Sequence, residues 1–106
     1  MAHVVDIKSK NPLLGTWRSC DPFEDNVQYT ISADNGKLAV TGIDTSDGEV
    51  PEIRDVVWFE DKGLLQFSSY WPSTGRLTKY RLSASVSKDR VQVSYSFTAQ
   101  QIWEKL

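Results

Sequence analysis

The chain has 106 residues, which is enough for one domain with a single hydrophobic core. Its 12 basic and 14 acidic residues are interspersed and give a formal net charge of −2, which argues against a nucleic-acid-binding surface. One histidine, His3, and one cysteine, Cys20, exclude an intramolecular disulfide and argue against a zinc site or a catalytic triad.

The sequence predicts neither a membrane span nor a catalytic site. No apolar run approaches the roughly 18 residues that a span needs, and residues 1–10 lack the apolar core of a signal peptide, so we expect a cytoplasmic protein. No catalytic residue, metal site or cofactor follows from the pattern. An enzyme is therefore not the expected class, and the charged residues Glu52, Arg54 and Asp55 fit a solvated strand face.

We expect a polar tail over residues 1–10, followed by a single domain over residues 11–106. Asn11-Pro12 predicts one short helical turn, because asparagine caps helices and proline is tolerated at the first helical position. The first strand is then expected over residues 15–20, since Thr16-Trp17-Arg18 favours an extended chain.

Six further strands are predicted from alternating apolar residues bounded by turn residues. Most of the turns are short, and Asn35-Gly36 has the composition of a type I′ hairpin. A loop over 21–26, which contains Pro22 and several acidic residues, separates the first strand from the rest. The predicted strands cover residues 27–33, 37–44, 52–60, 64–70, 76–86 and 90–98.

The last stretch, residues 99–106, leaves two possibilities. Thr98 and Gln101 have the spacing of a helical capping box, which would begin a short helix. We prefer an eighth strand, because a closed barrel needs a last strand to pair with the first. Eight short strands joined mainly by hairpins predict an all-β fold: an eight-stranded antiparallel up-and-down barrel, with Trp17 as the plug at one end.

Two segments carry a resemblance to a known group of proteins. Gly15-Thr16-Trp17-Arg18 and Gln101-Ile102-Trp103-Glu104-Lys105 are similar to the first and last strands of the fatty-acid-binding proteins. These belong to the calycin group with the lipocalins, and the resemblance implies a lipocalin-like barrel that holds a ligand. It also implies that Gln101 and Trp103 contact the ligand head group. The arginine that binds a carboxylate in that family is absent, which implies a neutral head group.

The predicted ligand is a small apolar or amphipathic molecule inside the barrel. Its alternative is a packed barrel whose aromatic side chains only fill the interior. The predicted ligand-binding residues are Trp17, Tyr29, Phe67, Tyr80, Tyr95, Gln101 and Trp103.

The fourth predicted strand suggests a second kind of function. Its centre, Val56-Val57-Trp58-Phe59, is apolar on both faces, so the face that does not enter the barrel needs a cover. A homodimer through the predicted fourth and fifth strands, with Val57, Phe59 and Leu64 at the contact, would supply it.

Overall fold

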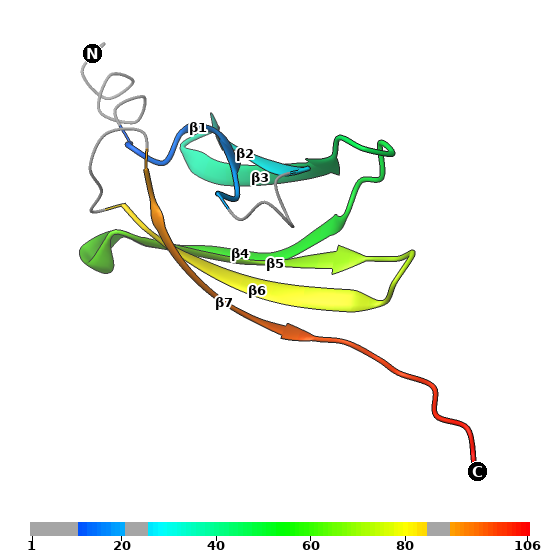
Figure 1. Cartoon of the computed structure of the whole chain (residues 1–106). Coiled ribbons are helices and arrows are strands. Elements are labelled where there is room, and N and C mark those ends of the chain that lie inside the picture. Colours follow the sequence, from blue (N-terminus) through cyan, green and yellow to red (C-terminus); the bar gives the residue numbers. More distant parts are fainter. Residues whose placement is uncertain (1–10, 21–25, 85–89) are drawn as a thin grey trace, which may run out of the picture.

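The computed structural model describes residues 11–20, 26–84 and 90–106, and in them the chain forms seven strands in two antiparallel sheets (Figure 1). The first sheet has the order β1-β2-β3 and the second has the order β4-β5-β6-β7. The strands of the first sheet are β1 (Gly15–Arg18), β2 (Val27–Asp34) and β3 (Lys37–Asp44). Those of the second are β4 (Glu52–Phe59), β5 (Leu64–Trp71), β6 (Arg76–Ser83) and β7 (Gln92–Thr98).

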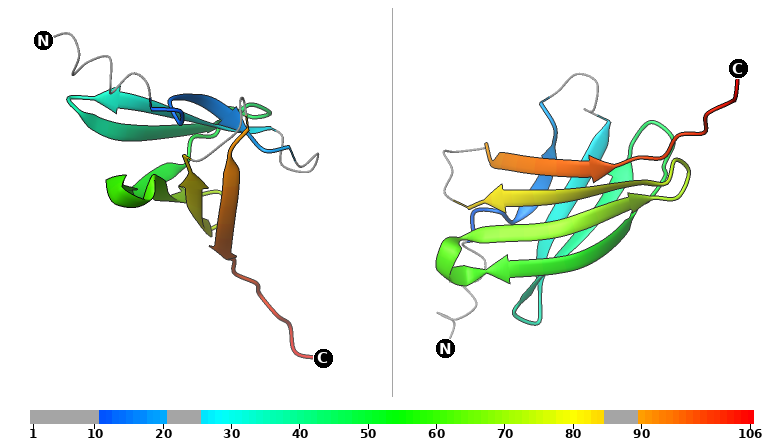
Figure 2. Two further views of the ribbon diagram at one scale, coloured as in Figure 1. Left: turned by 90° about the vertical axis from the view of Figure 1, so that its left-hand side faces the viewer. Right: turned by 90° about the horizontal axis from the view of Figure 1, so that it is seen from below.

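The two sheets lie face to face as separate layers, and the strands of one layer cross those of the other (Figure 2). The chain crosses from the first sheet to the second in the connection between β3 and β4. On the opposite side, β1 and β7 are the outer strands of their sheets and do not pair with each other. The predicted eight-stranded closed barrel is therefore wrong, although the prediction of antiparallel hairpins in chain order is right.

The barrel prediction fails at its last element, because residues 99–106 form neither a strand nor a helix. Strand β7 pairs with β6 up to Leu77↔Thr98, and the chain then continues in an extended path away from both sheets (Figure 1). The sequence Ala99-Gln100-Gln101 lacks the glycine, proline, asparagine or aspartate that a reversal needs. Without that reversal, no eighth strand lies between β7 and β1.

The predicted N-terminal helical turn is also wrong, since residues 11–14 form a single hydrogen-bonded turn that is not continued. The Asn11 side-chain oxygen accepts a hydrogen bond from the Leu13 N–H at 3.0 Å, and the Leu14 N–H donates to the Asn11 carbonyl at 3.1 Å. Gly15 then begins β1. The tail predicted over residues 1–10, most of the loop over 21–26 and the turn after the sixth strand lie outside the described residues.

The hairpins follow the turn chemistry of the sequence. Asn35 and Gly36 have φ angles of 49° and 81°, as a type I′ turn requires, and they set the register Asp34↔Lys37. A 3₁₀ turn, η1 (Glu60–Lys62), leads from β4 to Gly63, whose φ of 57° allows the chain to enter β5.

Strand β4 departs from the regular strand that the sequence predicts. Its register to β5 shifts between Arg54 and Val57, and Asp55 between them has a φ of 55°. This irregularity is a β-bulge, which bends the strand and re-aims the side chains that follow it. The expected solvated face is confirmed, because Arg54 donates two hydrogen bonds to the exposed Glu52 carboxylate, at 3.0 and 3.1 Å. The same contacts hold the pKa of Glu52 below its ordinary value.

The core between the sheets is small. Both layers contribute to it, but it occupies only part of the space that the strands enclose. Among the described residues the buried hydrophobic side chains of the core are Leu13, Ile31, Val40, Leu65, Phe67 and Leu82.

Candidate ligand-binding cleft

The space that the core leaves unfilled forms a cleft between the two sheets, with a volume of about 700 Å³. Residues from the edge strand β1 lie on one wall, and residues leading into and along β7 lie on the other. Its volume is within the range of pockets that bind small molecules, about 300–1,000 Å³. The inner wall is formed by Trp17, Tyr29, Ile31, Phe67, Thr78, Tyr80, Leu82, Val91, Val93 and Tyr95.

Four aromatic rings form the centre of this wall. Phe67, Tyr80 and Tyr95 lie side by side because their strands pair in the register Phe67↔Tyr80 and Tyr80↔Tyr95. Tyr29 reaches them from the other sheet, and the ring centroids of Tyr29, Phe67 and Tyr80 are each 5.3 Å from one another. The Tyr95 centroid is 6.2 Å from that of Tyr80. All the rings are tilted, an arrangement that stabilises aromatic clusters.

The position of Tyr29 depends on a glycine in the neighbouring strand. Gly42 is buried and pairs with Tyr29 in the register of β2 and β3. A Cβ atom at Gly42 would lie 2.8 Å from the Tyr29 ring and 3.0 Å from Pro51. The absence of a side chain at Gly42 therefore gives the Tyr29 ring its place over the strand.

Hydroxyl groups lie within the otherwise apolar wall. The Tyr29 hydroxyl donates to Ser69 Oγ at 2.8 Å, and its oxygen lies 3.5 Å from the Tyr80 hydroxyl oxygen. Ser69 is fully buried, and the part of the chain that the structure describes contains no buried side-chain polar atom that lacks a hydrogen-bond partner. The cleft therefore combines aromatic surface with a small hydrogen-bonding group at its centre.

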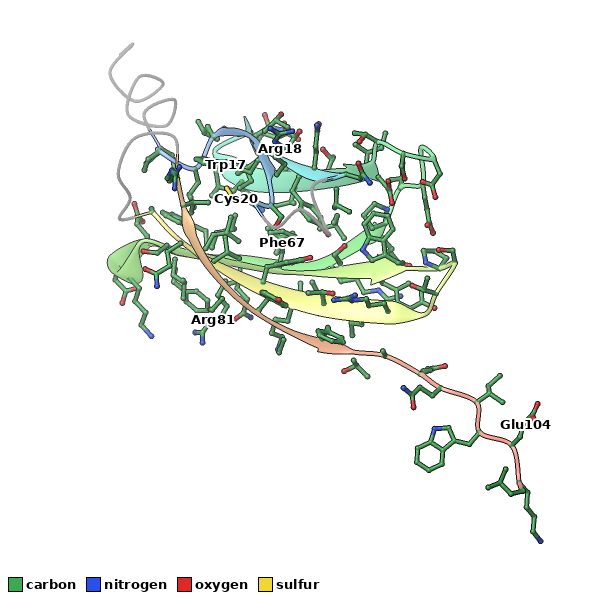
Figure 3. All side chains as sticks on the ribbon, viewed as in Figure 1. Trp17, Arg18, Cys20, Phe67, Arg81 and Glu104 are labelled. Carbon is green, nitrogen blue, oxygen red and sulfur yellow. The ribbon has the colours of Figure 1, made fainter. Side chains whose placement is uncertain are left out.

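Trp17 stands on the β1 side of the cleft, and Figure 3 shows it with Cys20 above Phe67 in the space between the sheets. It is half-buried, and its indole N–H donates to the Leu13 carbonyl at 2.8 Å. This bond explains why the turn at residues 11–14 comes directly before β1. Trp17 is thus a wall residue of an open cleft, and its predicted role as the plug of a closed barrel is wrong.

Charged residues of both signs stand around the cleft. Of those that the structure describes, three are basic and three are acidic: Arg18, Arg76, Arg90, Asp44, Asp47 and Glu49. The Ser46 hydroxyl and backbone N–H donate to the Asp44 carboxylate and lower its pKa. Glu49 accepts hydrogen bonds from Ser73, from the hydroxyl at 2.7 Å and from the backbone N–H at 3.1 Å, and so ties the β3–β4 connection to the β5–β6 turn.

Five of the seven predicted ligand-binding residues line the cleft: Trp17, Tyr29, Phe67, Tyr80 and Tyr95. Gln101 and Trp103 lie elsewhere, in the exposed segment beyond β7, where the Trp103 indole N–H donates to Gln101 Oε1 at 2.9 Å. The predicted set omitted Thr78, although alternation with Tyr80 places it on the inner face of β6. Ser69, which alternation places on the face of Phe67, is buried behind the wall.

The residues that the structure describes contain no helix long and apolar enough to cross a membrane. In the same residues no three histidine, cysteine, aspartate or glutamate side chains come together in a group that could hold a metal ion.

The fold and the cleft define a class: an all-β protein of two antiparallel sheets with an aromatic cleft left open between them. Comparison of the chain with protein-family models, curated proteins and solved structures found no match. What the cleft does must therefore be argued from its own geometry.

Proposed function

We propose that the protein is a binding module whose cleft takes a small, neutral amphipathic molecule. The observation that carries the proposal is the cluster formed by Tyr29, Phe67, Tyr80 and Tyr95 on the wall of a cleft of about 700 Å³. Aromatic walls with a few placed polar groups are typical of small-molecule sites.

The charges and hydroxyls of the cleft support a neutral ligand. Among the described residues the cleft carries three basic and three acidic side chains, a balance that favours neither an anion nor a cation. Tyr29 and Tyr80 supply hydroxyl groups on the cleft wall that can bond a single polar atom, and the buried Ser69 accepts the Tyr29 hydroxyl proton behind them. A flat apolar ring bearing one hydroxyl group is the chemistry that fits both features.

The test is titration with 2-naphthol, followed by NMR shifts of the backbone amides. The expected result is saturable binding, with the largest shifts in β2, β5 and β6. Tyr95→Ala is expected to weaken binding roughly twofold to tenfold, because an aromatic contact contributes about 0.5–1.5 kcal/mol. The carboxylate 2-naphthoate, which has the same ring system, is expected to bind no tighter than 2-naphthol.

Phe97→Ala is the matched control. Phe97 follows Tyr95 on the same side of β7 and is equally exposed, at 53% against 54%, but it packs against Arg76, with the guanidinium carbon 4.1 Å from the ring centroid. This variant is expected to bind 2-naphthol like the wild type. Equal weakening by both variants, or no saturable shift at millimolar 2-naphthol, would contradict the proposal.

The alternative function is a homodimer through β4 and β5. Val56 and Val57 favour it, because they stay exposed on the surface at 37% and 39%. Phe59 and Leu64 are half-buried, and Lys62 lies over the Phe59 ring at 5.7 Å, so the uncovered area is small. Loss of dimer in Val57→Ser would favour this alternative.

A further inference from the structure

The C-terminal segment, residues 99–106, exposes large apolar side chains far from the body of the protein. Ile102, Trp103 and Leu106 are 96%, 86% and 117% exposed relative to the standard reference. An extended segment in which a tryptophan and two aliphatic residues meet only water gains free energy from any surface that covers them.

The segment leads away from the cleft of its own chain. Figures 1 and 2 show it continuing outward from the end of β7 in every view, and Figure 3 shows Glu104 with the neighbouring side chains outside both layers. The chain has a radius of gyration of 15.8 Å and a longest dimension of 68 Å. A compact domain of this length has a radius of gyration of about 13 Å.

An apolar surface suited to the segment lies on the same molecule. The cleft is open between the edge strands β1 and β7, and Tyr95 and Val93 on its β7 wall are 54% and 40% exposed. The outer edge of β1 pairs with no strand among the described residues. Its backbone groups are therefore a template for an added strand.

We propose that the protein forms a homodimer in which residues 99–106 of each copy lie along β1 and over the open cleft of the other copy. Every chain carries both the segment and the cleft. A reciprocal exchange about a two-fold axis therefore fills both clefts and gives a closed dimer. The second copy is favoured over the segment's own chain because the segment already extends away from the cleft that it would have to reach.

Alternation in the extended segment separates Trp103, which fits the cleft, from Ile102 and Leu106. In an extended chain Trp103 is on the same face as Tyr95, whereas Ile102 and Leu106 are on the opposite face. The cleft volume of about 700 Å³ accommodates an indole beside the aromatic wall. Glu104 and Lys105 bring one charge of each sign to a rim that also carries both signs. The Trp103 indole and the proposed ligand would occupy the same aromatic wall, so the exchange and ligand binding compete, and association is measured without ligand.

The first test is sedimentation equilibrium of the full chain. The wild type is expected to be a dimer at micromolar concentrations, and Ile102→Ser/Trp103→Ser is expected to weaken association at least tenfold. Val57→Ser, on β4 and outside both the segment and the cleft, is the matched control and is expected to stay dimeric. A wild type that is monomeric at high concentration, or a dimer that Val57→Ser alone disrupts, would overturn the proposal.

The second test separates exchange between two copies from closure on one chain. Cys20 is the only cysteine, is exposed and lines the cleft. Cys20→Ser/Gln101→Cys is mixed with wild type under mild oxidation, so that every chain carries one thiol. The proposal expects a covalent heterodimer through the Cys20 and position-101 thiols, formed faster than either homodimer.

The complementary variant is Gln101→Cys in a chain that keeps Cys20. A disulfide within one chain would migrate as a monomer and would show that the segment closes on its own cleft. That result, or the absence of any heterodimer in the mixture, would overturn the exchange. Far-UV circular dichroism of each variant verifies that it folds as the wild type does.

Discussion

Gly42 shows how one residue decides the shape of the cleft. Its missing side chain makes room for the Tyr29 ring, which in turn contacts Phe67 and Tyr80 from the opposite sheet. We expect Gly42→Ala to destabilise the protein by about 1–3 kcal/mol, because the added methyl group overpacks the site. The Tyr29 ring would also have to move from its two aromatic neighbours. Urea denaturation measures the first effect and NMR ring-proton shifts measure the second.

Thr41→Ala is the control for this substitution. Thr41 precedes Gly42 in β3 but is exposed on the other face of the sheet. A loss of less than about 0.5 kcal/mol is expected, as for most surface substitutions. Equal losses in the two variants would show that Gly42 does not set the position of Tyr29.

Asp44 provides a pH prediction at the same scale. Hydrogen bonds from the Ser46 hydroxyl and backbone N–H lower the pKa of this carboxyl from its ordinary value of 3.8. A lowered folded-state pKa contributes stability that is present above 3.8 and is lost as the pH falls through the folded-state value. Ser46→Ala removes the larger of the two contributions, so the Asp44 pKa should rise toward 3.8 in an NMR titration. Ser73→Ala removes a hydrogen bond to Glu49 instead and should leave the Asp44 pKa unchanged.

At the scale of the element, the strands and turns were largely predictable. Seven strands appear near their predicted ranges because alternation and turn residues are local signals, and Asn35-Gly36 adopts the expected φ angles. The bulge in β4 was not predicted, because Asp55, although a residue type that regular strands disfavour, does not by itself specify a bulge. It arises from the pairing with β5, which is a relation between distant residues.

The bulge gives the element-scale prediction. Asp55 has a φ of 55°, a conformation that aspartate and asparagine tolerate and a β-branched residue does not. Asp55→Val is therefore expected to destabilise the protein by about 1–2 kcal/mol in urea denaturation, even though valine favours ordinary strands. Asp55→Asn is the control and should change stability by less than about 0.5 kcal/mol. An unchanged midpoint for the valine variant would show that β4 pairs without the bulge.

At the scale of the whole molecule, local signals did not determine how the sheets close. Trp17, Tyr29, Phe67, Tyr80 and Tyr95 line one cleft, because inward alternation survives whether the sheets form a barrel or two layers. Gln101 and Trp103 lie away from it, because residues 99–106 do not turn back. Similarity of a short segment to a family's last strand carries no information about the reversal that must precede it.

Exchange of the exposed segment would couple the stability of each folded chain to dimer formation. Binding of a second folded copy stabilises the native state by mass action, so the midpoint of thermal unfolding should rise with protein concentration. For the wild type we expect a rise of about 2–5 °C for each tenfold increase in concentration. Ile102→Ser/Trp103→Ser should show no such rise, and it should match the wild type at the lowest concentration because these side chains are exposed within a single chain. Scanning calorimetry over a hundredfold range of concentration measures both. A midpoint that is independent of concentration in the wild type would mean that each copy unfolds alone, with its segment in water.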